Sequence, residues 1–182
     1  MKYFMKTLRR EDIYSGKIFN VFRELIERDG KRYFVEIVEH PGAVVILPLK
    51  RDGKIIMVKQ YRYPIRKTIY ELPAGTLEEN EIPEKCALRE LLEETGYRAK
   101  KIEYLGSFYA SPGYSTEILY AYLAKELYFS KQKLEIDEKI TIVDFTLKEI
   151  VNMINKGLIR DSKTITTLFL YIEKYGLNLA NY

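Results

Sequence analysis

The stretch that decides the fold runs from Gly75 to Tyr97 and reads GTLEENEIPEKCALRELLEETGY. Its second half carries the signals of a helix. Proline suits the first helical position, where Pro83 stands, and glycine suits the position just after a helix, where Gly96 stands. The sequence therefore predicts a helix from about Pro83 to Thr95.

Three carboxylates of this helix, Glu90, Glu93 and Glu94, fall within one wedge of roughly 100°. A solvated acidic face is the ordinary interpretation. However, like charges at these spacings repel, and the helix dipole disfavours Glu93 and Glu94 in the last turn. A divalent cation would remove both penalties, and oxygen ligands suit Mg²⁺, with Mn²⁺ possible, rather than zinc. Spacing alone leaves the metal site and the solvated face equally open.

The whole pattern is more specific than the helix. One pattern in this stretch resembles the Nudix box. It consists of Gly75, five residues, Glu81, seven residues and then Arg89–Gly96 (RELLEETG). The final position, usually aliphatic in that family, is Tyr97 here. The resemblance implies an α+β fold of the Nudix type, a mixed-sheet αβα sandwich. It also implies Mg²⁺-dependent cleavage of a nucleoside diphosphate derivative.

The resemblance also assigns roles. It implies metal ligands at Ala74 (through its carbonyl), Glu81, Glu90, Glu93 and Glu94. Arg89 would orient the glutamates by ion pairing, and together with Glu90, Glu93 and Glu94 it belongs to the expected catalytic set. Gly75 is expected to adopt dihedral angles that only glycine adopts easily.

Segments on both sides of the box resemble the ADP-ribose pyrophosphatase branch of the family. They are Gln60–Tyr63, Glu71–Gly75 and the run Ser111–Glu117 (SPGYSTE). This resemblance implies hydrolysis of ADP-ribose to AMP and ribose 5-phosphate. The substrate-binding residues it suggests are Arg62, Glu71, Pro112, Tyr114 and Glu117.

Each of these assignments has a plainer alternative. Arg62 is a candidate phosphate clamp, because a guanidinium matches phosphate oxygens, but it could be an ordinary surface arginine. The run Ser111–Glu117 could be a simple turn. The family's ADP-ribose members place the general base in a loop before the last strand. That position maps best to Glu138, with Glu135 as the alternative, and either could be a solvated charge.

Two other functions stay open. The same chemistry could act on a nucleotide sugar such as GDP-mannose, on NADH or on a dinucleoside polyphosphate. A Nudix-fold protein could also sense a nucleotide without cleaving it. The complete set of box glutamates argues against a pure binder, since such a protein has no need of every metal ligand.

The rest of the chain supplies strands and two further helices. Turn signals at Asp29-Gly30 and Asp52-Gly53 predict two hairpins. They join the segments Ile18–Glu27 with Arg32–Glu39 and Val44–Leu49 with Lys54–Lys59. Further strands are predicted near Lys101–Phe108, Glu117–Ala124 and Ile140–Phe145, and helices near Leu147–Asn155 and Ser162–Tyr175.

His40-Pro41-Gly42 is the candidate boundary between an N-terminal β-hairpin module, residues 1–41, and a catalytic domain, residues 42–182. Members of the branch commonly dimerise through such a module, so a homodimer is expected. The apolar surface available for it comes from Phe19, Phe22, Tyr33 and Phe34.

Composition narrows the remaining classes. A net charge of +4, dispersed along 182 residues, predicts no nucleic-acid binding. No apolar run reaches the roughly 20 residues of a membrane-spanning helix, so no membrane insertion is expected. The single cysteine, Cys86, is expected to be a small buried residue and fits a cytoplasmic location.

Overall fold

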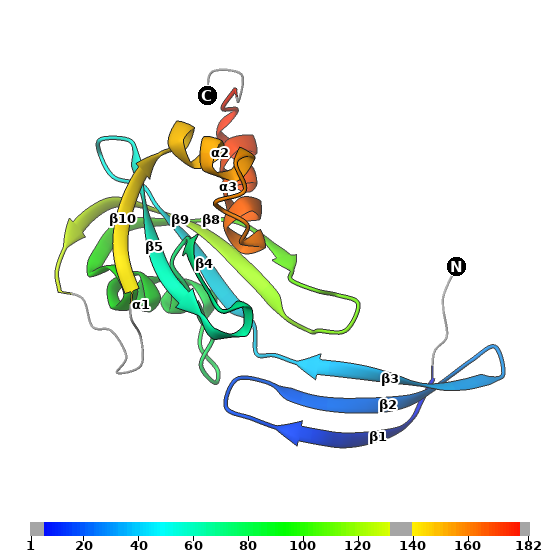
Figure 1. Cartoon of the computed structure of the whole chain (residues 1–182). Coiled ribbons are helices and arrows are strands. Elements are labelled where there is room, and N and C mark those ends of the chain that lie inside the picture. Colours follow the sequence, from blue (N-terminus) through cyan, green and yellow to red (C-terminus); the bar gives the residue numbers. More distant parts are fainter. Residues whose placement is uncertain (1–5, 132–139, 179–182) are drawn as a thin grey trace.

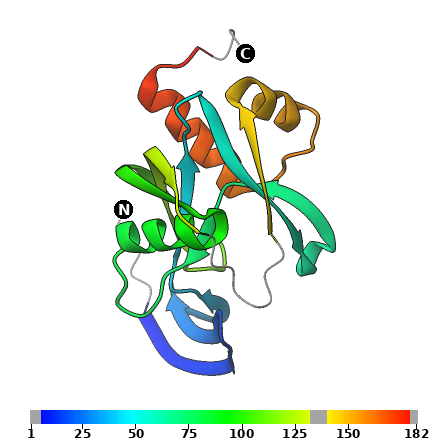
Figure 2. The same ribbon diagram turned by 90° about the vertical axis from the view of Figure 1, so that its left-hand side faces the viewer.

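Two sheets and three helices form the body of the protein in the computed structural model, which describes residues 6–131 and 140–178 (Figure 1). The mixed sheet has the order β7 (Ala74–Thr76), β4 (Ala43–Pro48), β9 (Ile118–Phe129), β8 (Tyr97–Tyr109). The second sheet has the order β10 (Ile140–Thr146), β5 (Lys54–Arg62), β6 (Lys67–Glu71), and a short helical turn, η1 (Tyr63–Ile65), joins its last two strands. The hairpin of β5 and β6 reaches out to one side of the body (Figure 2).

The core lies on both faces of β4, whose six residues are all buried. Val44 and Ile46 pack with Cys86, Ala87 and Leu91 of the box helix. The alternate residues Val45 and Leu47 belong to a second cluster with the two C-terminal helices. A strand covered on both faces is apolar throughout, as in buried parallel sheets. Helices therefore lie on both sides of the sheets, and the predicted α+β sandwich is confirmed.

All three helices occupy the ranges that the sequence predicts: α1 (Pro83–Thr95), α2 (Leu147–Asn155) and α3 (Ser162–Tyr175). Gly96 ends α1 in the left-handed conformation. Thr146 and Glu149 form a capping box at the start of α2, and Asp161 caps α3.

The N-terminal segment forms a sheet of its own beside the body (Figure 1). The predicted hairpin is present as β2 (Asn20–Arg28) and β3 (Lys31–Glu39), and β1 (Lys6–Ser15) adds a strand that the sequence did not indicate. Phe22, expected on the surface, is instead 5% exposed beneath the guanidinium of Arg10.

The second predicted hairpin is wrong. Its strands β4 and β5 belong to different sheets and share only the isolated bridge between Leu49 and Ile55. Beyond that bridge β4 pairs with β9 and β7, while β5 pairs with β10 and β6. The turn at Asp52-Gly53 therefore redirects the chain from one sheet to the other.

Two further expectations concern the chain as a whole. Cys86 is fully buried, as predicted. None of the helices in residues 6–131 and 140–178 combines the length and the apolar character that crossing a membrane requires.

Candidate active site

The site begins where β7 meets the C-terminal half of α1. The backbone N–H of Ala74 donates a hydrogen bond to Oε2 of Glu94 at 3.0 Å. Ala74 is itself paired with Val45 of the buried strand β4, so the anchor point is rigid. Glu94 is only 3% exposed. A carboxylate in the last turn of a helix, next to other glutamates, is thus held almost wholly inside the protein.

Gly75 leaves the space that Glu90 occupies. A Cβ placed on Gly75 would lie 1.9 Å from Cδ of Glu90, far inside van der Waals contact. Gly75 is not among the residues with positive φ, so the expectation of special dihedral angles is wrong. The reason for glycine is the close approach of a carboxylate to the strand backbone.

We predict that Gly75→Ala lowers activity without unfolding the protein. The new methyl group would push the Glu90 carboxylate away from β7, and displacements of about 1 Å at a reacting centre can cost roughly 100-fold. The expected loss of kcat is about 10- to 100-fold, measured beside the melting temperature. Gly113→Ala is the matched control, because a Cβ at Gly113 meets no atom within 4 Å. Equal activity of Gly75→Ala and wild type would contradict the steric role.

Four glutamates, Glu81, Glu90, Glu93 and Glu94, make up what is called here the acidic cluster. Arg89 contacts three of them. Its Nε and Nη2 donate to the two oxygens of Glu81 at 2.9 and 2.8 Å, and its Nη1 donates to Glu90 at 2.7 Å and to Glu93 at 3.0 Å. Its Nη2 also reaches the carbonyl of Thr76 at 3.2 Å. The hydrogen bond from Arg89 lowers the pKa of Glu81 to about 2. One guanidinium thus holds three carboxylates and ties α1 to β7.

The donor chemistry of this cluster fits a hard divalent cation. Its acidic side chains, Glu81, Glu90, Glu93 and Glu94, offer oxygen atoms only. Burial raises the pKa of the neighbouring Cys86 thiol, which disfavours the thiolate that a soft metal would need. Among the described residues no group of three or more His, Cys, Asp or Glu side chains is already arranged around a metal position.

A second charged group lies at the end of β6. Glu71 is 1% exposed, and its oxygens accept hydrogen bonds from Arg62 at 2.8 and 2.6 Å and from Lys163 at 2.6 Å. Arg62 is close enough to Glu94 for the carboxylate's charge to help raise the pKa of the guanidinium, after the larger effect of its hydrogen bond to Glu71. The structure thus brings the two sequence candidates Arg62 and Glu71 into one ion pair beside the acidic cluster.

Lys163 is the residue that sequence reasoning missed. A lysine in the first turn of a helix carries no signal for a contact 92 residues away.

The run Ser111–Glu117 lies between β8 and β9. The N–H groups of Tyr114 and Ser115 both donate hydrogen bonds to the carbonyl of Ser111, and these bonds close a turn that contains Pro112. The same segment is joined to the end of β3, where the N–H of Val38 donates to the Tyr114 carbonyl at 2.8 Å. Oε1 of Glu117 lies 4.0 Å from Nδ1 of His40. Pro112, Tyr114 and Glu117 thus lie near the end of β3, and Glu135 and Glu138 lie outside the described residues.

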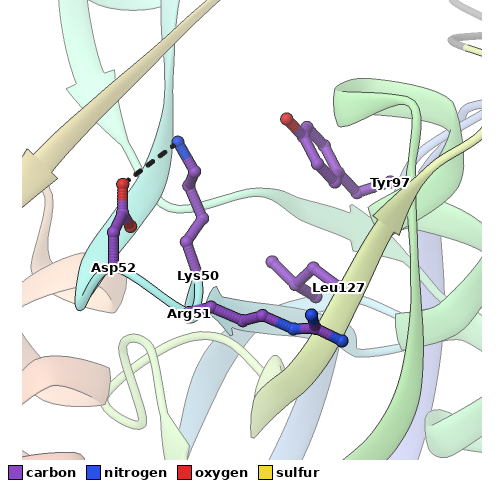
Figure 3. A pocket seen from close by; sticks show the side chains of 5 residues that line it. All are labelled: Lys50, Arg51, Asp52, Tyr97 and Leu127. Atoms are coloured by element: carbon purple, nitrogen blue, oxygen red, sulfur yellow. Dashed lines mark ion pairs between the residues drawn. The ribbon is translucent and has the colours of Figure 1, made fainter.

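A cavity of about 290 Å³ lies beyond the C-terminal end of α1 and is lined by Lys50, Arg51, Asp52, Tyr97 and Leu127. Figure 3 shows the ion pair between Lys50 and Asp52 next to the ring of Tyr97. The lining includes none of the candidate site residues. This cavity is therefore separate from the acidic cluster.

Comparisons with known proteins bear on the fold and the family of this chain. A solved structure described as an ADP compounds hydrolase superposes with a TM-score of 0.83 over 94% of this chain and 96% of its own, at 22% identity, which establishes the fold. ADP-ribose pyrophosphatase of Bacillus subtilis (strain 168) is 46% identical over 162 residues, covering 87% of this chain and 88% of that protein. Methanol dehydrogenase activator of Bacillus methanolicus is 43% identical over 165 residues, covering 88% of each.

GDP-mannose pyrophosphatase of Yersinia enterocolitica is 35% identical over 147 residues, covering 75% of each chain. The model of the NUDIX domain matches residues 39–166, a range that contains α1, the acidic cluster and Lys163. This chain therefore belongs to the NUDIX family.

Proposed function

We propose that the protein hydrolyses the pyrophosphate bond of ADP-ribose, giving AMP and ribose 5-phosphate, with Mg²⁺ as its cofactor and Mn²⁺ as a substitute. One observation carries the proposal. Glu90 and Glu94 are packed against the backbone of Ala74 and Gly75, in a chain 46% identical to an ADP-ribose pyrophosphatase.

The proposed roles follow from charge and position. Glu90 and Glu94 would hold the metal ion together with the Ala74 carbonyl, and Glu93 and Glu81 would support it. Arg89 keeps these carboxylates together before the ion arrives. A divalent ion, when bound, neutralises phosphate oxygens and lowers the pKa of a coordinated water. Arg62, which lies close enough to Glu94 to feel its charge, supplies a guanidinium for a phosphate oxygen.

The remaining substrate contacts are also part of the proposal. Pro112, Tyr114 and Glu117, in the turn that is hydrogen-bonded to Val38 of β3, would contact the nucleoside part of the substrate. Glu138 would be the general base that takes a proton from the attacking water, with Glu135 as the alternative.

Residues 1–41, which include the N-terminal sheet, are proposed to be the dimerisation module of a cytoplasmic homodimer, and residues 42–182 its catalytic domain. The exposed apolar side chains of this module include Ile13, Tyr14, Ile18, Phe19, Tyr33 and Phe34. An exposed apolar surface of this kind favours association. Sedimentation equilibrium would test the dimer, and a fully active monomer would refute it.

The activity is tested by incubating the purified protein with ADP-ribose and about 5–10 mM Mg²⁺, enough to saturate a weak carboxylate site. AMP and ribose 5-phosphate are expected, and EDTA should abolish them. GDP-mannose, NADH and diadenosine polyphosphate serve as the comparison panel. Faster turnover of another panel member would support Nudix hydrolysis but would contradict the assignment of ADP-ribose as the substrate.

A second candidate function is nucleotide-dependent regulation of another enzyme. It is favoured by the 43% identity to a methanol dehydrogenase activator. A folded protein that binds ADP-ribose but cleaves no member of the panel would support this candidate over the first.

A further inference from the structure

We propose that Lys163 is a positioning residue for the substrate site. With Glu71 it fixes the guanidinium of Arg62, and it affects the substrate only through Arg62. This inference rests on the proposed function, because it assigns to Arg62 a phosphate group of the substrate. It assigns to Glu71 a buried anchoring role in place of the substrate contact that the sequence suggested.

The first step of the argument is the geometry of Arg62. Its Nε and Nη2 donate to separate oxygens of Glu71, so the planar guanidinium is held along one edge by two hydrogen bonds. Within residues 6–131 and 140–178, the Nη1 of Arg62 donates no hydrogen bond, and the side chain is 37% exposed. A guanidinium fixed along one edge presents its other N–H groups in a defined direction, as recognition of a phosphate requires.

The second step is what holds Glu71. This carboxylate is almost wholly buried, and burial alone would raise its pKa. Hydrogen bonds and charges from Arg62 and Lys163 more than offset that effect and lower the pKa. Lys163 donates to the same oxygen, Oε2, that accepts from Arg62 Nη2, so the lysine fixes the oxygen that orients the guanidinium.

The third step is why Lys163 cannot act as a mobile surface lysine. Its ammonium group also contacts Asp161 at 2.9 Å, and its side chain is 17% exposed. Asp161 caps α3 through Thr164, whose hydroxyl oxygen in turn accepts the N–H of Leu72 at 2.8 Å. The first turn of α3 is thereby fixed to the residue that follows Glu71. Both contacts of Lys163 point into this network rather than toward solvent.

The position of the network connects it to the reaction site. Glu71 is three residues before Ala74, whose N–H holds Glu94. The guanidinium of Arg62 thus bonds a carboxylate that is fixed to α3, and it lies close enough to Glu94 of α1 for that carboxylate's charge to act on it. Loss of Lys163 would leave Arg62 present but free to change its orientation, which weakens substrate binding more than it alters the chemical step.

The test is a double-mutant cycle between Lys163 and Arg62 on the full chain. Lys163→Met is expected to raise KM for ADP-ribose about tenfold and to change kcat less than about twofold, and Lys163→Arg should restore KM. In the Arg62→Ala background, Lys163→Met should change KM less than about twofold. Binding of ADP-ribose measured by calorimetry in EDTA should weaken by the same factor as KM.

Lys174→Met is the matched control, since Lys174 lies on the same helix and pairs with Glu103 away from this site. An equal rise of KM in the presence and absence of the Arg62 side chain would overturn the inference, as would an unchanged KM in Lys163→Met. If Lys163→Met does not fold, the same cycle with Glu71→Gln decides the question by the same criteria. A wild-type protein that forms no AMP refutes the proposed function instead, which separates the two failures.

Discussion

Replacing Glu94 by Gln is expected to reduce kcat for ADP-ribose about 1000-fold. Gln has nearly the same shape and can still accept the hydrogen bond from the Ala74 N–H, so the loss isolates the negative charge. Charge stabilisation at a metal site is worth several kcal/mol, and each 1.36 kcal/mol is tenfold in rate. The measurement is kcat at saturating ADP-ribose over a series of Mg²⁺ concentrations, beside the melting temperature of both proteins.

Glu84→Gln is the control for this variant. Glu84 lies in the first turn of the same helix and is exposed, outside the glutamates of the acidic cluster. Its replacement should leave kcat within about twofold, as surface substitutions usually do. Glu94→Gln with the kcat of the wild type would contradict a metal-binding role for the most deeply buried glutamate of α1.

Local signals were enough to predict the helices. Pro83 and Gly96 mark the two ends of α1. The preference for proline at the start of a helix and for glycine just after its end arises from the backbone of that helix alone. Thr146 and Asp161 mark the starts of α2 and α3 in the same way, by hydrogen bonds to residues three positions further on. Such signals need no knowledge of the rest of the fold.

The pairing of strands could not be predicted in this way. The turn at Asp52-Gly53 is a good hairpin signal, yet β4 and β5 separate after the bridge between Leu49 and Ile55. What decides the outcome is that β4 is apolar on both faces and can be covered only in the middle of a sheet, by β9 and β7. That choice depends on two strands further along the chain, β7 and β9, on which a local pattern carries no information.

In the candidate site, too, the local features could be predicted from the sequence and the tertiary contacts could not. The box places its glutamates on one helix, and their spacing is visible in the sequence. The reason for Gly75 was mistaken, because the approach of Glu90 to β7 is a tertiary contact. The network of Arg62, Glu71 and Lys163 joins a hairpin to the last helix, and no motif spans that separation. The three-dimensional contacts thus change the roles assigned to the residues of the site more than they change which residues belong to it.

Replacing Arg89 by Met is expected to destabilise the protein by about 3 kcal/mol in EDTA, because breaking a partly buried ion pair leaves carboxylates without a compensating charge. Four hydrogen bonds link Arg89 to Glu81, Glu90 and Glu93, whose side chains are only 13%, 13% and 33% exposed. Adding Mg²⁺ should restore part of the lost stability, because the ion supplies positive charge to the same oxygens. The measurement is urea unfolding of both proteins with EDTA and with Mg²⁺.

The size of the Mg²⁺ effect is the more informative result for Arg89→Met. A ligand that binds only the folded state stabilises it according to its affinity, and the variant should gain more from Mg²⁺ than the wild type, in which Arg89 already neutralises the cluster. Arg98→Met removes an exposed arginine just after α1 and should cost less than about 0.5 kcal/mol with no change in the response to Mg²⁺. If Arg89→Met were as stable as the wild type in EDTA, the guanidinium would not be what holds these carboxylates together. If it were destabilised but gained nothing from Mg²⁺, the oxygens around Arg89 would not be those that bind the ion.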